Sequence, residues 1–450
     1  MSEDDAAKGG SPGVSTTKQG TETHQAERRR WVEATIWTER MLAALDNGVK
    51  GGKWFSLIDK AFRPTTLEAA WRQVAANKGA AGVDGISVER FRQNAPHYLR
   101  ELGESLKDGT YRPEPVRRVY IPKADGKRRP LGIPAVKDRI VQAALKMVLE
   151  PIFEQAFLPV SFGFRPGLGC KDALRNVDEL LKSGFIWVVD ADMKSYFDSI
   201  PHDNLMNRVK EKISDSRVLD LLELFLKQDI MEDTKRWTPT SGTPQGAVLS
   251  PLLANIYLHP LDALITNAGH AMIRYADDFV ILCRSRAEAE EALELVRTWV
   301  ADNGLSLHPD KTHVGNCTGE GEGFEFLGYR FECGRRHVRK KSVKSLRERI
   351  RERTRRTCGK SIEMVIAAIN PTLKGWFEYF QHAWKSVFPS MDGFVRRRLR
   401  AILRTQKKRP GFGKCLSDHL NWPNSFFAAL GLFTMTEAHR RAHQSRCGNH

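Results

Sequence analysis

The sequence lacks any apolar run of about 18 residues or more, the length that a helix needs to cross a bilayer. The first residues, Met-Ser-Glu-Asp-Asp, show no basic segment followed by an apolar one, so they do not resemble a secretory signal. Cysteines number seven, and no Cys-x-x-Cys pair indicates a zinc ribbon or a redox motif. These absences predict a cytoplasmic protein with reduced thiols and no membrane partner.

Acidic residues are scarce toward the C-terminus. Residues 334–450 contain 27 lysines and arginines but only 7 acids, a net charge of +20, whereas the whole chain of 450 residues carries +17. Such a block, with little acid between its cations, is more typical of a surface that contacts a polyanion than of a solvated helix face. We therefore predict that this region contacts nucleic acid.

The length predicts about two to four packed units, at roughly 100 to 200 residues each. Residues 1–28 are polar with almost no large apolar side chains, which predicts a disordered tail. The chain is then expected to form an N-terminal helical extension at 29–61, an α+β body at 62–335, an all-α region at 336–410 and a basic, DNA-binding-like C-terminal region at 411–450.

Hydrophobic patterns place the expected strands and helices in the body. Extended runs at 116–122 and 128–133 flank an Asp-Gly pair, which is a strong hairpin signal. A second hairpin is predicted at 271–283 and a single strand at 324–331. Beyond Lys344 the pattern is helical, with breaks expected at Asn370-Pro371 and Pro410-Gly411.

Two apolar runs lead into acidic residues. Phe185-Ile-Trp-Val-Val continues into Asp190-Ala-Asp192, and Asp277-Asp278 is followed by Phe-Val-Ile-Leu. Carboxylates on adjacent apolar strands repel one another and lose hydration, so they persist only where cations neutralise them. Two magnesium ions fit, because they prefer hard oxygen ligands and support in-line phosphoryl transfer. An ordinary Asp-rich surface turn is the alternative, although four apolar residues rarely follow one directly.

Short motifs along the chain resemble, in this order, those of the group II intron-encoded reverse transcriptase/maturase family of the endonuclease-less type. They are Gly-Ala-Ala-Gly-Val-Asp-Gly (79–85), Ile-Pro-Lys (121–123), Lys-Arg-Arg-Pro-Leu-Gly-Ile-Pro (127–134), Ser-Phe-Gly-Phe-Arg-Pro-Gly (161–167), Asp-Met-Lys-Ser-Tyr-Phe-Asp (192–198), Gly-Thr-Pro-Gln-Gly (242–246), Tyr-Ala-Asp-Asp (275–278), Leu-Ser-Leu (305–307), Lys-Thr (311–312) and Phe-Leu-Gly-Tyr (326–329). The resemblance implies a right-hand polymerase fold, with fingers and palm at 62–335 and a thumb, or maturase domain, at 336–410.

The resemblance also implies a role for individual residues. Asp192, Asp277 and Asp278 would form the catalytic triad that binds two Mg²⁺ ions, with Mn²⁺ as a possible substitute. The incoming nucleotide would be bound by Lys123 and Arg129 at its triphosphate, by Phe197 beneath its sugar, by Gln245 beside its base and by Lys311, which would protonate the leaving pyrophosphate. Each of these residues also has a structural alternative. Phe197 could simply pack in the core, Lys123 and Arg129 could be solvated cations of a hairpin, and Lys311 could be an ordinary surface lysine.

The expected partners are an RNA template, group II intron RNA, a DNA primer or target, and deoxynucleotides, with the protein associated with the nucleoid while it acts. Candidate nucleic-acid contacts are Arg165, Arg349, Arg353, Arg356, Lys374, Arg396, Arg397 and Arg400. Trp376 and Phe377 of the motif at 370–380 are expected to pack the helices rather than stack on bases. Whether the protein is a monomer or a dimer stays open.

The expected function is RNA-directed DNA synthesis together with intron splicing and mobility. Three alternatives stay open: a maturase that binds intron RNA with a weak polymerase site, a reverse transcriptase without an intron that serves defence, a CRISPR-linked system or repair, and an RNA-dependent RNA polymerase. Retention of all three acids argues against the first, and Phe197 argues against the third.

Overall fold

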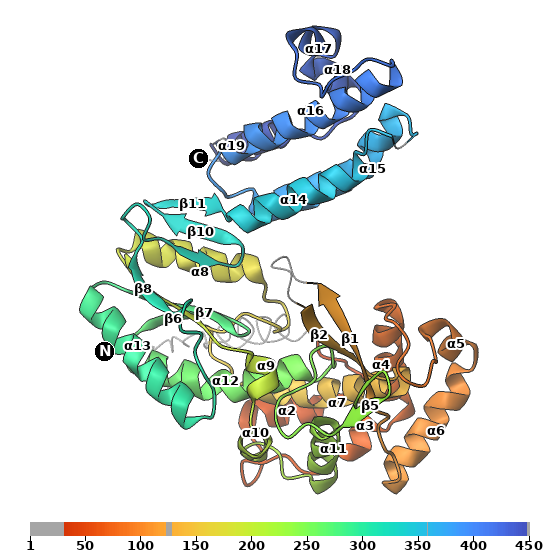
Figure 1. The fold of residues 1–450 in the computed structure, drawn as a ribbon. Coiled ribbons are helices and arrows are strands. Elements are labelled where there is room, and N and C mark those ends of the chain that lie inside the picture. The colour runs from red at the N-terminus through yellow and green to blue at the C-terminus, as the bar shows by residue number, and fades with distance from the viewer. Residues whose placement is uncertain (1–30, 123–127, 358, 448–450) are drawn as a thin grey trace, which may run out of the picture. The chain divides into compact units, whose positions relative to one another are not determined.

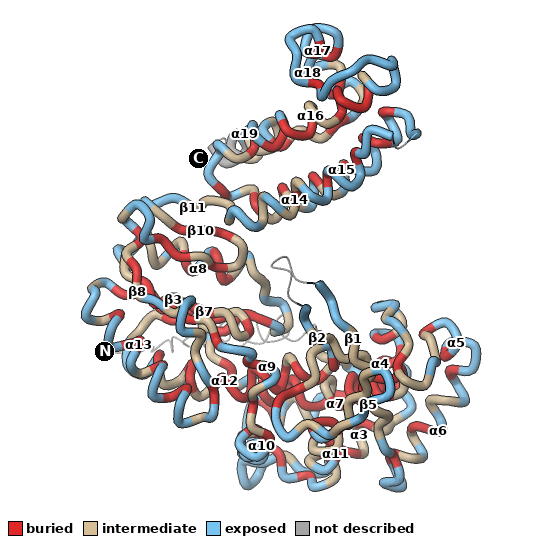
Figure 2. The backbone as a smooth tube through the Cα atoms, viewed as in Figure 1, coloured by how far each residue is buried: buried red, intermediate tan, exposed pale blue. Residues whose placement is uncertain are grey.

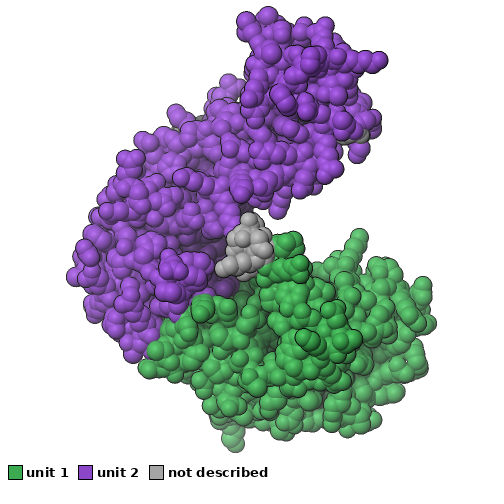
Figure 3. Space-filling model, viewed as in Figure 1, with its two compact units in different colours: residues 1–169, 194–263, 300–306 green, residues 170–193, 264–299, 307–450 purple. Residues whose placement is uncertain are grey.

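The computed structural model describes residues 31–122, 128–357 and 359–447. The chain divides into two compact units (Figure 3). Unit 1 is made of Met1–Gly169, Lys194–Ala263 and Val300–Ser306, and unit 2 of Cys170–Met193, Leu264–Trp299 and Leu307–His450. Lys123 and the predicted tail at 1–28 lie outside the described residues, so the predictions made for them stay predictions. The division into fingers and palm at 62–335 and thumb at 336–410 likewise stays a prediction.

Unit 1 is mainly helical and packs around α7. Proline at the first turn starts α4, and α7 is buried on most sides because α3, α4 and α6 all pack against it (Figures 1 and 2). Its helices are α2 (Glu39–Asn47), α3 (Ile58–Ala61), α4 (Pro64–Ala76), α5 (Val88–Gln93), α6 (Ala95–Asp108), α7 (Val136–Glu154), α9 (Tyr196–Ser199), α10 (His202–Lys210) and α11 (Ser216–Leu226). Helix α12 (Ser250–Asn267) continues from unit 1 into unit 2.

A four-stranded sheet in unit 1 carries the predicted cationic hairpin. Its order is β2-β1-β4-β5, and β1 pairs antiparallel with β2 from Arg117 opposite Ile133 to Pro122 opposite Arg128. The hairpin predicted from the Asp-Gly signal is therefore confirmed. Its strands are β1 (Val116–Pro122), β2 (Arg128–Ile133), β4 (Ile230–Glu232) and β5 (Lys235–Trp237).

Unit 2 contains an antiparallel sheet of order β6-β7-β3-β8. The apolar residues of β3 and β7 are almost all buried, which explains why both read as continuous hydrophobic runs. Helix α8 packs against β6 and β7. The elements are α8 (Cys170–Lys182), β3 (Trp187–Asp192), β6 (Ala271–Tyr275), β7 (Asp278–Cys283), α13 (Arg286–Asp302), which continues into unit 1 from Val300, and β8 (His313–Asn316). This arrangement confirms the predicted α+β fold class and the hairpin at 271–283.

The prediction of one strand at 324–331 is wrong. The segment forms two strands, β9 (Phe324–Phe326) and β10 (Tyr329–Glu332), which pair antiparallel and are joined by β11 (Arg335–Val338) in a separate sheet. The turn sits at Leu327 and Gly328, whose φ angles are 48° and 83°. Because glycine adopts positive φ readily, Gly328 permits a turn that the apolar pattern conceals.

A helical bundle follows the β9–β11 sheet in unit 2 (Figure 1). Helices α14, α15 and α16 pack against one another, and α19 packs against α15 and α16. The bounds are α14 (Lys340–Arg353), α15 (Ile362–Phe380), α16 (Val387–Gln406), α17 (Leu416–Asn421), α18 (Asn424–Ala429) and α19 (Met435–Cys447). We call α14–α19 the C-terminal bundle. No helix in the described part of the chain is long and apolar enough to span a membrane.

The helix break predicted at Asn370-Pro371 is absent, because α15 continues through both residues. Proline removes one backbone donor from a helix interior and ordinarily favours a kink or an end. Here tertiary contacts hold the segment: the Asn370 side chain donates to the Gly431 carbonyl (2.8 Å) and accepts from the Phe433 amide (2.9 Å). Phe377 is buried against Phe433, as predicted for this motif. Packing thus overrides the local preference.

Candidate active site

The three predicted catalytic acids all lie in unit 2, at the ends of neighbouring strands. Asp192 ends β3, and its Cα partner across the ladder is Asp278, the first residue of β7. Tyr275 is in turn opposite Asp278, so Ala276 and Asp277 form a two-residue turn. Opposed residues in an antiparallel pair project to the same face. The structure therefore brings Asp192 and Asp278 together and places Asp277 directly beside them in the turn.

The turn is held from within by a buried arginine. Arg274 is fully buried, and its Nη1 donates to the Ala276 carbonyl at 2.9 Å. Ala276 has φ of 61°, which a residue other than glycine adopts only at a cost. A strained turn at the centre of a buried hairpin, fixed by a buried cation, is a positioned feature rather than an ordinary surface loop.

A fourth carboxylate lies beside the triad. Asp190 is two residues before Asp192 on β3, so both side chains leave the same face of the strand. Burial raises the pKa of Asp190 to about 6, while His313 on the paired strand β8 favours its charged form. Sequence reasoning did not include Asp190 in the site, although the period of two in Asp190-Ala-Asp192 would have indicated it.

The carboxylates disfavour one another's ionisation. Burial raises the pKa of Asp278 to about 7, and the charges of Asp190, Asp277 and Asp192 add to that effect, while Arg339 opposes it weakly. The site therefore has more negative charge than its own cations neutralise. A bound divalent ion would relieve this deficit.

The Lys311 ammonium forms an ion pair with the Asp192 carboxylate. Both side chains are partly exposed, 58% for lysine and 37% for aspartate. The backbone adds a second link, since the His308 amide donates to the Asp192 carbonyl at 2.7 Å. Lys311 thus pairs with one of the predicted catalytic acids, and its role toward the leaving pyrophosphate stays a prediction.

Among the described residues, no group of three or more histidine, cysteine, aspartate or glutamate side chains converges closely enough to hold a metal ion. The donor chemistry nevertheless fits magnesium, because Asp192, Asp277 and Asp278 offer only hard carboxylate oxygens. The raised pKa of Asp278 points the same way. The residues present thus suit a divalent ion in type and in strand register.

Unit 1 brings three of the five predicted nucleotide contacts, Arg129, Phe197 and Gln245, together around one loop. The loop at 242–246 makes backbone hydrogen bonds to two other segments. The Thr243 amide donates to the Phe197 carbonyl at 2.6 Å, and the Gly132 amide of β2 donates to the Gln245 carbonyl at 2.7 Å. Gly246 has φ of 108°, and a Cβ there would lie 2.5 Å from the Gly132 carbonyl oxygen. Only glycine allows this approach. The loop therefore connects the segment of Phe197 to the cationic hairpin.

The Gln245 side chain links two further groups of unit 1. Its Oε1 accepts from Arg129 Nε at 2.8 Å, and its Nε2 donates to Asp198 Oδ2 at 2.9 Å. Arg129 is exposed on β2, so its remaining guanidinium donors face solvent. The structure thus brings Arg129, Gln245 and Phe197 into one local assembly, and the binding of a nucleotide there stays a prediction.

Phe164 is a residue that the sequence did not single out. Its ring meets Phe197 edge to face at 6.5 Å between centroids, it is 46% exposed, and its backbone has φ of 60°. A bulky residue at positive φ is a rare conformation that the surrounding structure must impose. Phe164 is therefore positioned to set the orientation of the Phe197 ring.

Two family models match the chain. Residues 121–331 match the model for reverse transcriptase (RNA-dependent DNA polymerase), and residues 343–420 match the group II intron, maturase-specific domain. Protein YkfC of Escherichia coli (strain K12) is 35% identical over 329 residues, which cover 64% of this chain and 85% of YkfC. The chain belongs to the group II intron-encoded reverse transcriptase/maturase family. The family predicted from the motifs is confirmed.

The match to another relative covers a smaller share of both chains. The group II intron-encoded protein LtrA of Lactococcus lactis subsp. cremoris is 42% identical over 204 residues, which are 45% of this chain but only 34% of LtrA. Telomerase from Candida albicans, solved with a fragment of telomeric RNA, matches with a TM-score of 0.42 and 13% identity over 77% of this chain and 68% of that one. That score is too low to support an argument about function.

The predicted nucleic-acid contacts of this reverse transcriptase differ in exposure. Arg349, Arg353, Arg356 and Lys374 are exposed on the C-terminal bundle, and Arg396 and Arg397 are half-buried. The face of α16 opposite them is buried, as predicted, through Phe394, Val395, Leu399, Ile402 and Leu403. These six basic residues remain available to a polyanion.

Arg165 and Arg400 are placed differently. The Arg165 side chain is 8% exposed, pairs with Glu154 at 2.6 Å and donates to the carbonyls of Leu158 and Ser161. Arg400 is 2% exposed and donates to the Trp422 carbonyl at 3.0 Å. Their donors are directed into the protein, so the placement favours structural roles over the predicted contacts with nucleic acid.

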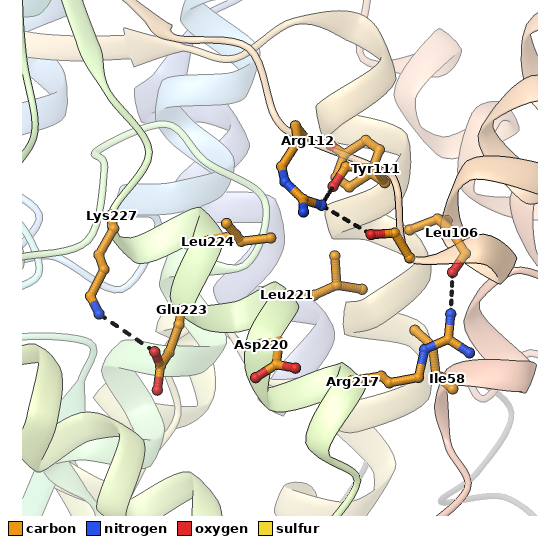
Figure 4. Close-up of a pocket in the computed structure, with 11 residues that line it drawn as sticks. Ile58, Leu106, Tyr111, Arg112, Arg217, Asp220, Leu221, Glu223, Leu224 and Lys227 are labelled. Atoms are coloured by element: carbon orange, nitrogen blue, oxygen red, sulfur yellow. Dashed lines mark hydrogen bonds and ion pairs between the residues drawn. The ribbon is translucent and has the colours of Figure 1, made fainter.

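A cavity of about 460 Å³ lies in unit 1, and none of the residues that line it is a predicted site residue (Figure 4). The Arg217 guanidinium on its wall donates to the carbonyls of Leu106 and Lys107, and Arg112 donates to the Gly109 carbonyl at 3.0 Å. Arg217 and Arg112 thus close the C-terminal end of α6, whereas Lys227 pairs with Glu223 on α11 at 3.5 Å.

Tyr379 joins the C-terminal bundle to the β9–β10 hairpin. Its hydroxyl donates to the Leu327 carbonyl at 2.7 Å, and the Tyr329 hydroxyl donates to the Tyr379 carbonyl at 2.5 Å. Burial raises the pKa of Tyr379, and nearby Cys170, Tyr275 and Asp278 raise it further. The same side chain therefore lies near the β6–β7 hairpin that carries two of the predicted catalytic acids, a connection that motif order could not reveal.

Proposed function

We propose that this protein extends a DNA primer with deoxynucleotides along an RNA template, and that it binds group II intron RNA to assist splicing and mobility. The observation that carries the proposal is the in-register pairing of Asp192 with Asp278 on adjacent buried strands, with Asp277 in the turn between β6 and β7. Family membership supports the reaction class, and the intact acids argue against a maturase with a decayed polymerase site.

In this proposal the acids of unit 2 hold two divalent ions, which would activate the primer hydroxyl and neutralise the leaving pyrophosphate. Magnesium is the expected ion and manganese the expected substitute, because both accept carboxylate oxygens. The chain's own contribution is to fix the carboxylates on rigid strands. Lys311 is placed at Asp192, where its ammonium can supply a proton to a phosphate oxygen.

The assembly in unit 1 would bind the nucleotide. The exposed guanidinium of Arg129 suits a triphosphate, since its planar donors can bind two phosphate oxygens at once. Phe197 would lie beneath the sugar and exclude a ribose 2′-hydroxyl by steric contact, and Phe164 would hold that ring in place. Gln245 orients Arg129 through their 2.8 Å hydrogen bond.

The basic face of the C-terminal bundle is the surface proposed for RNA. Exposed arginines on α14 would contact the phosphate backbone, and affinity should fall steeply with salt because each neutralised phosphate releases counterions. The maturase-specific match at residues 343–420 supports intron RNA as the partner.

The test is primer extension on a primed RNA template with deoxynucleotides and Mg²⁺, followed by splicing of a group II intron RNA with and without the protein. Extension and faster splicing together support the proposal. Splicing without extension would indicate the maturase alternative, and extension that needs ribonucleotides would indicate an RNA polymerase. Extension with no effect on any intron RNA would indicate a reverse transcriptase that serves another process.

A further inference from the structure

Three large apolar side chains are exposed in one short segment of the C-terminal bundle. Phe412 is 65% exposed, Leu416 78% and Leu420 74%. Leu416 and Leu420 lie one turn apart on α17, so they share a face of that helix. We call these three side chains the apolar tip. Single exposed apolar residues are ordinary, but several in one place indicate an interaction site.

The segment that carries the apolar tip is fixed to α16. A Cβ at Gly413 would lie 2.8 Å from the Ala401 amide nitrogen and the Arg397 carbonyl oxygen, so the two backbones are in contact. Asp418, only 2% exposed, pairs with Arg404 at 2.6 Å and anchors the inner side of α17. The outer side then presents the leucines from a rigid support, which lowers the entropy cost of binding.

Cations surround the apolar tip. Some of these cations come from the segment between α14 and α15. That segment is held at the end of α16, because the Gln406 side chain donates to the Lys360 carbonyl at 2.9 Å. Between residues 404 and 421 the single acid is Asp418, which is buried and paired. The surface around the tip is therefore positive, through the exposed side chains of Arg356, Lys360, Lys407, Lys408, Arg409 and Lys414.

The chemistry of the tip fits a polyanion that also offers flat apolar faces. The Arg356 guanidinium lies 4.6 Å from the centre of the Phe412 ring, and an aromatic ring beside a guanidinium is a surface on which nucleic acid bases stack. A second copy of this chain would present the same positive charge and be repelled. Paired bases are stacked on each other already, so unpaired bases are the better match.

We propose that the apolar tip is a platform on which unpaired bases of RNA stack, while the surrounding cations hold the flanking phosphates. The choice of RNA rests on the proposed function. The apolar tip lies within the residues that match the maturase-specific domain, 343–420. The proposal separates two contributions: the cations set the salt dependence of binding, and the apolar tip sets the preference for single-stranded RNA.

The experiment uses the full chain and a hairpin RNA whose single-stranded loop carries 2-aminopurine, a base whose fluorescence reports stacking. Phe412→Ala should weaken binding by roughly fivefold to a hundredfold, the range for a base stacked on an aromatic ring, and alter the fluorescence of the bound loop. The double variant Leu416→Ala/Leu420→Ala should act in the same direction with a smaller effect, because the leucines lack an aromatic face. The salt slope should not change. Lys414→Ala should instead lower the slope by about 0.7 to 0.9 with little effect on fluorescence.

Phe55→Ala is the matched control, because Phe55 is equally exposed at 65% but lies in unit 1. It should bind the loop as the wild type does. Binding by Phe412→Ala and by the double variant equal to that of the wild type would overturn the proposal. So would equal affinity for a fully paired RNA or DNA duplex, a tip-dependent change in sedimentation, which indicates self-association, or tip-dependent retention on anionic lipid vesicles.

Primer extension in the same preparations separates this proposal from the proposed function. Asp277→Ala should lose extension and keep the fluorescence change, whereas Phe412→Ala should lose the fluorescence change. Loss of extension in the wild type would refute the polymerase assignment alone.

Discussion

Asp138 should make the stability of unit 1 depend on pH near neutrality. It is completely buried on α7, and burial raises the pKa of its carboxyl to about 7 even though Tyr111 and the Glu114 amide donate to it. The unfolded value is about 3.9. The folded state holds this proton more tightly than the unfolded state does. The contribution of Asp138 to the free energy of unfolding is therefore fully present below about pH 4 and is lost as pH rises to about 7. The loss approaches about 4 kcal/mol, at 1.36 kcal/mol per pKa unit.

The perturbation is Asp138→Asn, which keeps the shape and removes the charge. The introduced amide oxygen can accept from the Glu114 amide and from Gln228, which donates to Asp138 at 3.2 Å, and the introduced amide nitrogen can donate to the Tyr111 hydroxyl. The free energy of unfolding is measured by urea unfolding, followed by tryptophan fluorescence, between pH 5 and 8. This pH range spans about two thirds of the change expected from Asp138. The variant should lose the part of the pH dependence that Asp138 contributes and be more stable above pH 7, while Asp278 and Asp190, whose pKa values burial raises to about 7 and about 6, keep their own contributions. An equal slope in both proteins would refute the assignment of the titration to Asp138.

Three further predictions concern the site and the bundle. Phe197→Ala should reduce discrimination against ribonucleotides by at least roughly tenfold, measured as the ratio of kcat/KM for the two nucleotides; an unchanged ratio would leave Phe197 a packing residue. Arg165→Ala should lower the free energy of unfolding by roughly 3 to 5 kcal/mol, because Glu154 loses its buried partner, while the salt slope of RNA binding stays constant; a reduced slope would restore Arg165 as a phosphate contact. Tyr379→Phe should cost roughly 1 kcal/mol through the lost bond to Leu327 and raise KM for the primer more than it lowers kcat, whereas equal effects on both would place Tyr379 closer to the chemistry.

The strands of the site could be predicted because their patterns are local. Asp277 and Asp278 are flanked by apolar residues on both sides, and a buried hairpin with a tight acidic turn is the simplest structure that satisfies that pattern. The cationic hairpin was equally predictable, because its turn signal and its strands lie within a few residues of one another. Pairing of β3 with β7, which brings Asp192 opposite Asp278, joins residues far apart in the chain and came only from the family resemblance.

The errors arose where distant contacts decide a local structure. Pro371 reads as a helix end, but Asn370 is held by the loop that begins at Gly431, and no local pattern contains that contact. Whether Arg165 and Arg400 contact nucleic acid stays a prediction, and composition could not show that both guanidinium groups have partners inside the protein. Asp190 is a different case, because the period of two of a strand already places it on the same face as Asp192.

The central claim is that Asp192, Asp277 and Asp278 form the centre that copies RNA into DNA. The most direct measurement is single-turnover addition of a deoxynucleotide to a primed RNA template by the wild type, by Asp277→Ala and by Asp172→Ala, a control that removes an acid of unit 2 paired with Arg175 at 3.1 Å on α8. Asp277→Ala should lose at least roughly a thousandfold in rate, about 4 kcal/mol of transition-state stabilisation, and bind RNA normally, while Asp172→Ala extends like the wild type. Extension by Asp277→Ala at the wild-type rate would contradict the account.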